Sequence, residues 1–169
     1  NLRMFRILQG DVGSGKTIVA IVSAMNVVES GYQCGLMAPT AILAEQHYKM
    51  LEELITNSGL DIKIKLLTGK IDVKNRKKIL DDLQDKKIDF LIGTHALFQK
   101  TILFNKLGLV IIDEQHKFGV QQRIKFAKKG GINCDVLLMS ATPIPRTMMM
   151  SIYGDMDTSK LEEKPMHRQ

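Results

Sequence analysis

The stretch GDVGSGKT at Gly10–Thr17 decides the fold of this 169-residue chain. It fits the pattern G-x-x-x-x-G-K-[ST], and it stands between a predicted strand that ends at Leu8 and a predicted helix that begins at Thr17, as the pattern requires. Glycines permit a tight turn in which successive backbone N–H groups point at phosphate oxygens, and the helix presents the positive end of its dipole to the same charge. The stretch therefore predicts a phosphate-binding loop.

The loop also supplies two functional side chains. We expect Lys16 to reach the β- and γ-phosphates of a nucleotide and the Thr17 hydroxyl to bind Mg²⁺. The other loop residues expected to contact the nucleotide are Gly10, Gly13, Ser14 and Gly15. A glycine-rich turn that only joins a strand to a helix is the alternative interpretation.

Short apolar runs alternate with longer segments of helical period, which is typical of repeated βα units around a parallel sheet. We expect strands at Met4–Leu8, Gln33–Met37, Lys63–Leu67, Phe90–Ile92, Leu109–Asp113 and Asp135–Ser140. We expect helices at Thr17–Ser30, Ile42–Asn57, Val73–Gln84 and Val120–Lys129, and a further one from about Pro145 to Tyr153. The sequence thus predicts one α/β domain with a mostly parallel central sheet and helices on both faces.

The expected helices differ in the spacing of their apolar residues. The first is apolar nearly all round over Ile18–Val28, so it should be largely buried. The second carries Leu43 and His47 on one stripe that should lie on the sheet. In the third, Val73 is expected to face the core, whereas the lysines of Lys74–Lys78 should line a solvated face, with a nucleic-acid-binding patch as the alternative.

Two neighbouring acids follow the most apolar run of the chain. Leu109–Ile112 suits a central strand covered on both faces, and Asp113 and Glu114 project from its C-terminal end, where ligands bind in open α/β sheets. We expect Asp113 to hold Mg²⁺, directly or through water. Glu114 can orient or deprotonate an attacking water, because an ordinary carboxylate is ionised at neutral pH. A solvated strand end is the alternative.

Composition limits the other functional classes. The net charge of +6, from 24 Lys and Arg against 18 Asp and Glu, permits an anionic partner without identifying one. Cys34 and Cys134 form no CxxC pair and have no nearby His cluster, which excludes the common zinc spacings and a disulfide scaffold and favours a reducing cytosol. No apolar run approaches the ~18 residues that span a bilayer, so no membrane partner is expected.

Five segments in this order resemble superfamily 2 helicases and, more narrowly, the RecG family of bacterial branched-DNA helicases. They are GDVGSGKT, APTAILAEQH, GTHALFQ, DEQH and SATPIPRT. The segments Leu67–Lys70 and Leu107–Arg123 fit the same family, and the similarity runs from Leu8 to about Asp157. The resemblance implies a RecA-like P-loop NTPase lobe that binds ATP and Mg²⁺ in an ATP-dependent DNA helicase of the bacterial cytoplasm.

The resemblance also implies roles at individual positions. Segments that touch the DNA backbone in such helicases match at Pro39, Thr40, Thr94 and His95. Positions that link hydrolysis to movement match at Gln115, His116, Ser140 and Thr142. For the Ser and Thr residues, ordinary helix N-caps and turn residues are the alternative.

The resemblance implies a first helicase lobe over residues 1–158 and a tail over residues 159–169 that leads to a second lobe. The expected partners are branched or duplex DNA, the second lobe and a DNA-wedge domain. The chain is thus expected to be a piece of a longer polypeptide and nearly inactive alone, because the second lobe supplies an arginine finger. Two alternatives remain, namely the motor lobe of a transcription-repair coupling factor and a non-catalytic nucleotide-dependent docking module.

Overall fold

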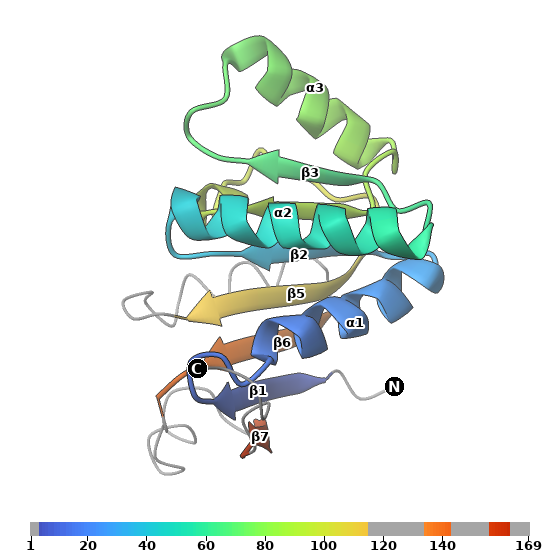
Figure 1. Cartoon of the computed structure of the whole chain (residues 1–169). Helices are drawn as coiled ribbons and strands as arrows, with labels where there is room; N and C mark the ends of the chain where they lie inside the picture. The colour runs from blue at the N-terminus through green and yellow to red at the C-terminus, as the bar shows by residue number, and fades with distance from the viewer. Residues whose placement is uncertain (1–3, 115–133, 143–155, 163–169) are drawn as a thin grey trace.

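The structure, a computed structural model, describes residues 4–114, 134–142 and 156–162. Within these ranges a seven-stranded sheet has the strand order β3-β4-β2-β5-β6-β1-β7, and every pairing is parallel (Figure 1). The strands are β1 Phe5–Gly10, β2 Gln33–Met37, β3 Ile64–Leu67, β4 Phe90–Gly93, β5 Leu107–Glu114, β6 Asp135–Ser140 and β7 Asp157–Leu161. The predicted parallel α/β architecture is confirmed.

Helices pack on both faces of the sheet, and Figure 1 shows α1 and α2 in front of it. They are α1 Lys16–Glu29, α2 Ala41–Ser58, α3 Val73–Gln84 and the short 3-10 helix η1 His95–Phe98. On one face, α1 and α2 pack on an apolar cluster that contains Leu36 and Ile111. On the other face, Leu83 of α3 and Leu97 of η1 join a second cluster that contains Val110. Val110 and Ile111 belong to different clusters because successive strand residues point to opposite faces.

The predicted elements within the described ranges all form, with small shifts at their ends. The predicted helices Val120–Lys129 and Pro145 to Tyr153 lie outside the described residues. Two elements were not predicted, η1 and β7. The sequence DTSKL of β7 is mostly polar and exposed, so no apolar pattern marks it as a strand. β7 pairs with β1 and crosses the expected boundary at residue 158.

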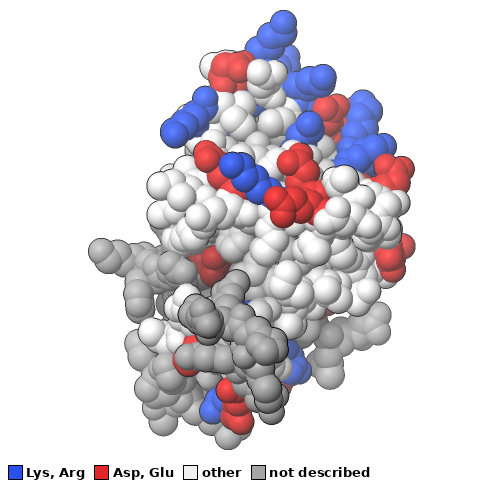
Figure 2. Space-filling model, viewed as in Figure 1, with Lys and Arg blue, Asp and Glu red and all other residues white. Residues whose placement is uncertain are grey.

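The expectation that α1 is largely buried is wrong. Ile21 and Ala24 pack on the sheet, whereas Ile18, Val19 and Val22 are between 40% and 51% exposed. A single helical layer covers this face of the sheet, so an apolar residue on the outer side of α1 meets water. The surface over α1 is accordingly low in charge, whereas charged side chains gather over α2 and α3 (Figure 2).

The expected core position of Val73 is also wrong, because its side chain is 85% exposed. Val73 is the first residue of α3 and follows the N-cap Asp72, whose side chain accepts a hydrogen bond from the Asn75 backbone N at 2.9 Å. The lysines of Lys74–Lys78 are exposed, as expected. Lys and Arg mix with Asp and Glu over the α3 end of the molecule (Figure 2), which favours a solvated face.

The side chains of Cys34 and Cys134 are both buried, and burial raises the pKa of the Cys34 thiol above its usual value. Among the described helices none combines the length and the apolar character that crossing a bilayer requires.

A buried glutamine joins three segments at the start of the central strands. Gln33 is 0% exposed, and its Nε2 donates to the Leu83 carbonyl at 2.9 Å and to the Ile88 carbonyl at 2.7 Å. The Lys106 backbone N donates to Gln33 Oε1 at 3.0 Å. The side chain therefore holds the end of α3 and the starts of β4 and β5 beside β2.

We expect Gln33→Leu to destabilise the fold by about 3–5 kcal/mol, because it removes three hydrogen bonds and leaves the Ile88 carbonyl and the Lys106 N–H without their side-chain partner. Urea unfolding of the 169-residue chain measures this difference. Gln84→Met is the matched control, since Gln84 is exposed at the end of α3 and a surface change of this kind shifts stability by about 0.5 kcal/mol or less. Equal stability of the two variants would contradict the proposed role of Gln33.

Candidate functional site

The candidate residues lie along one edge of the sheet, at the C-terminal ends of its strands (Figure 1). The strands β4, β2, β5, β6 and β1 are neighbours in that order. Met37 of β2 pairs with Gly93 of β4 and Ile112 of β5, and Ser140 of β6 pairs with Glu114 of β5. At about 4.8 Å between strands, the four steps from β4 to β1 span about 19 Å.

The loop between β1 and α1 has the backbone geometry of an anion site. Gly13 and Gly15 have φ values of 84° and 91°, in the left-handed region that favours glycine. The Ser14 backbone N donates to the Asp11 carbonyl at 3.1 Å and closes the turn. Because α1 begins at Lys16, the first N–H groups of the helix have no intrahelical acceptor and remain available to a phosphate.

The Lys16 side chain folds back onto this loop. Its Nζ donates to the Gly10 carbonyl at 2.6 Å and to the Asp11 carbonyl at 2.7 Å. Burial lowers the pKa of the Lys16 ammonium, and the negative charges of Asp113 and Asp11 oppose this shift. A phosphate oxygen is a stronger acceptor for an ammonium than a backbone carbonyl is, so a bound triphosphate would compete for Lys16.

Gly10 has no room for a side chain. A Cβ at Gly10 would lie 2.5 Å from Ser14 Oγ and 3.1 Å from Leu161 Cβ, so the loop and β7 both pack on this glycine. A cavity of about 290 Å³ lies here, lined by the loop, β7 and the segment after β6. Gln9 Nε2 and Ser14 Oγ are buried and have no hydrogen-bond partner among the described residues. These two buried polar atoms beside the phosphate loop are therefore available to hydrogen-bond a bound group.

Asp113 and Glu114 are the last residues of β5. Asp113 is 9% exposed, and its Oδ2 lies 2.7 Å from His47 Nε2. The backbone of Glu114 pairs with Ser140 of β6, which separates β5 from β1 in the sheet. The two acids thus end a strand that lies two steps from β1, the strand before the phosphate loop.

The oxygen donors at this edge fit Mg²⁺. Mg²⁺ prefers oxygen ligands and is commonly held by one or two carboxylates together with substrate phosphates. Asp113 offers a carboxylate and Thr17, in the first turn of α1, offers a hydroxyl. The described residues hold no cluster of three or more His, Cys, Asp and Glu that would bind a metal by itself.

The positions matched to DNA contacts follow the neighbouring strands β2 and β4. Thr40 Oγ1 accepts a hydrogen bond from the Leu43 backbone N at 3.2 Å, so the alternative role of Thr40 as an N-cap is confirmed. Its hydroxyl hydrogen can still be donated to another group. Pro39 is half-buried, Thr94 is buried and His95 is exposed at the start of η1. The DNA contacts themselves stay a prediction.

Two of the predicted coupling residues contact each other. Ser140 Oγ donates to the Thr142 carbonyl at 3.0 Å and lies 3.3 Å from Thr142 Oγ1. Ser140 is buried at the end of β6, whereas Thr142 is exposed. Gln115 and His116, the other two, lie outside the described residues.

His47 is the last residue of the segment APTAILAEQH, but no role was predicted for it, and the structure adds it to the site. Its side chain is 8% exposed and reaches Asp113 from α2. The sequence held a signal, because His47 stands in an otherwise apolar stripe with Leu43 and Leu51. A buried imidazole in such a stripe requires a polar partner.

Comparisons with known proteins agree with this arrangement. A family model described as DEAD/DEAH box helicase matches residues 4–151. The ATP-dependent DNA helicase RecG of Aquifex aeolicus (strain VF5) is 51% identical over 98% of this chain, and that of Staphylococcus aureus (strain MRSA252) is 50% identical over 99%. The chain spans 21% and 24% of the length of these two relatives.

Solved structures show the same fold. RecG bound to a three-way DNA junction is 45% identical, with a TM-score of 0.81 over 99% of this chain and 22% of that chain. The DUF1998 helicase MrfA bound to DNA is 19% identical, with a TM-score of 0.72 over 95% of this chain and 25% of that chain, and shows the fold alone. The RecA-like helicase lobe is thereby confirmed. From its match over residues 4–151, the chain belongs to the DEAD/DEAH box helicase family.

Proposed function

We propose that this chain is the first motor lobe of an ATP-dependent DNA helicase that remodels branched DNA in the bacterial cytoplasm. The similarity to RecG helicases over nearly the whole chain carries this proposal. The order of strands at the sheet edge supports it, because the segments matched to DNA contacts, the acids and the phosphate loop lie at the C-terminal ends of β4, β2, β5 and β1, within five consecutive strands of the sheet.

In this proposal the loop amides and Lys16 hold the phosphates of ATP. Thr17 and Asp113 hold Mg²⁺, which neutralises phosphate charge when it is bound. Glu114 accepts a proton from the attacking water. The buried position of Asp113 and the left-handed glycines of the loop support these roles.

The other half of the proposal concerns movement on DNA. Pro39, Thr40, Thr94 and His95 contact the DNA backbone, and the pair Ser140 and Thr142 couples the nucleotide state to lobe movement. Hydroxyl groups suit this task because they can exchange hydrogen-bond partners between two states. In the full-length polypeptide, the second lobe and the DNA-wedge domain are the partners of this chain.

The two alternative functions receive less support. The reported relatives are RecG helicases, which favours RecG over a transcription-repair coupling factor. A docking module that binds nucleotide without hydrolysis differs from the proposed motor only in the chemistry of the acids. Substitution at Glu114 separates these two functions.

We expect Lys16→Ala to weaken binding of a fluorescent ATP analogue about 10- to 150-fold, because one charged hydrogen bond to phosphate is worth about 1.5–3 kcal/mol. Fluorescence titration of the full-length protein measures the affinity. Lys65→Ala is the control, since it removes the same charge from the exposed side of β3, at the opposite end of the sheet from β1. Parental affinity of the Lys16 variant would overturn the nucleotide site.

We expect Glu114→Gln to lower kcat for ATP hydrolysis about 10²- to 10⁴-fold, because the amide cannot accept the proton of the water. Nucleotide affinity should stay at the parental value, since the substitution removes no phosphate contact. A phosphate-release assay and the fluorescence titration measure the two quantities. Unchanged hydrolysis would favour the docking module.

We expect the 169-residue chain alone to hydrolyse ATP about 10³- to 10⁵-fold more slowly than the full-length protein, because it lacks an arginine from a second lobe. Steady-state ATPase rates with and without forked DNA measure the difference. An isolated chain that matches the full-length rate and responds to forked DNA would contradict the two-lobe mechanism.

A further inference from the structure

The contact between His47 and Asp113 joins two segments that lie far apart in the sequence. His47 Nε2 and Asp113 Oδ2 are 2.7 Å apart, and both side chains are almost completely buried. The imidazole N–H donates to one carboxylate oxygen, which fixes the rotation of the carboxylate. Oδ1 is then the oxygen that Asp113 can offer to a cation. A buried hydrogen bond of this kind is little screened by solvent.

The helix that carries His47, α2, begins beside a position matched to DNA contacts. α2 begins after its N-cap Thr40, one of the positions matched to DNA contacts, and His47 follows about 10 Å along the helix axis. Both ends of α2 are capped, at the start by the Thr40 hydroxyl and at the end by Gly59 with a φ of 67°. α2 is therefore one continuous, capped helix of 18 residues that packs on the sheet.

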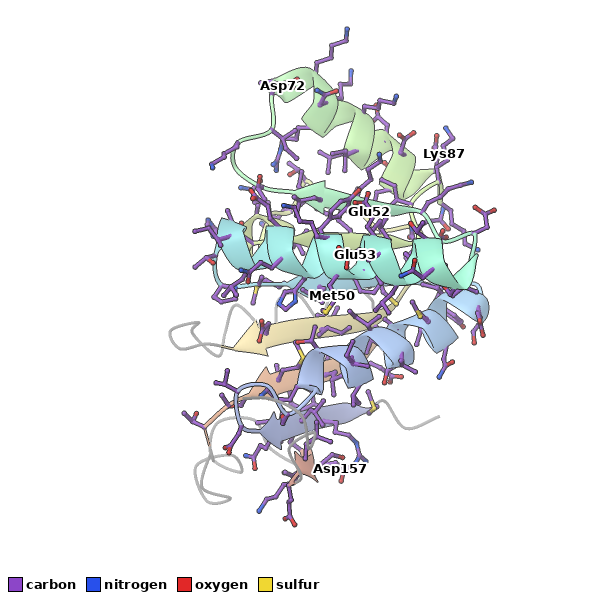
Figure 3. The ribbon with its side chains drawn as sticks, viewed as in Figure 1. Met50, Glu52, Glu53, Asp72, Lys87 and Asp157 are labelled. Atoms are coloured by element: carbon purple, nitrogen blue, oxygen red, sulfur yellow. The ribbon has the colours of Figure 1, made fainter. Side chains whose placement is uncertain are left out.

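The outer side of α2 differs from the side that carries His47. Figure 3 shows Glu52 and Glu53 on α2, where both side chains are exposed. Tyr48, the residue after His47, donates from its hydroxyl to Glu52 on the same helix at 3.0 Å. His47 thus contacts Asp113, whereas the neighbouring Tyr48 bonds to Glu52 within the helix.

We propose that His47 is a positioning residue that orients Asp113 for the divalent cation, and that α2 thereby links the DNA-binding end of the helix to the metal-binding acid. The proposal rests on the proposed function for what binds at each end. DNA phosphates at the N-terminus of α2 and the nucleotide-bound cation at Asp113 then act on the same rigid helix. The effect of binding at one end on affinity at the other is then equal in both directions, as thermodynamic linkage requires.

The first test measures the Mg²⁺ dependence of nucleotide binding in the full-length protein. His47→Leu keeps an apolar side chain in the stripe but removes the donor, so we expect the Mg²⁺ concentration for half-maximal binding of fluorescent ADP to rise about 10-fold or more. The affinity measured in a chelator should not change. His47→Gln carries an N–H group near the position of Nε2 and should restore most of the Mg²⁺ response.

Tyr48→Phe is the matched control, because it removes a hydrogen bond from the adjacent residue that does not reach Asp113. It should leave the Mg²⁺ response at the parental value. If His47→Leu does not fold, His47→Met lacks the donor with a more adaptable side chain and takes its place. If His47→Leu or His47→Met keeps the parental Mg²⁺ response, the positioning role is overturned. It is also overturned if His47→Gln is as defective as the variant that lacks the donor.

The second test measures coupling between DNA and nucleotide. In the parent, forked DNA should change the affinity for fluorescent ADP with Mg²⁺ by about 5-fold or more, and ADP should change DNA affinity by the same factor. His47→Leu should bring this factor close to 1, and retention of the parental factor overturns the link through α2. If the parental protein shows neither coupling nor ATP hydrolysis, both the link through α2 and the proposed function are refuted. The Mg²⁺ titration of the His47 variants still tests the positioning role of His47 separately.

Discussion

Parallel strand pairing is the constraint on which the rest of this structure depends. Because every described pairing is parallel, the C-terminal ends of all strands face one edge, and each loop that leaves a strand end meets its neighbours there. The β-bridge between Glu114 and Ser140, and that between Gln9 and Ser140, set three sequence-distant segments side by side. One edge thus gathers the phosphate loop, Asp113 and the segments that follow β2 and β4.

Local patterns allowed most of the fold to be predicted. The loop Gly10–Thr17 contains its own turn glycines and helix start, and the apolar run of β5 indicates a central strand without knowledge of its neighbours. The sequence did not indicate β7, because its polar residues form a strand only through pairing with β1. The exposure of the outer side of α1 could not be predicted either, because it depends on how many helical layers cover the sheet.

In the candidate site, too, local patterns could be predicted from the sequence, whereas contacts between distant residues could not. Asp113 was predictable because an acid after an apolar strand is visible in one stretch of sequence, whereas its contact with His47 joins residues 66 positions apart. Gln33 resembles His47 in this respect, since its carbonyl partners are 50 and 55 positions away. A buried polar residue in an apolar pattern announces that a partner exists, but only the folded chain identifies the partner.

The two borders of the sheet also have a consequence. β3 and β7 each pair with one strand among the described residues, and they carry Lys65 on one side and Asp157 and Lys160 on the other. Asp157 and Lys87 lie at opposite ends of the molecule (Figure 3). Short, charged border strands discourage a foreign strand from adding to the ladder. The described lobe therefore offers neighbouring copies no long, flat apolar ribbon on which amyloid-like stacking can begin.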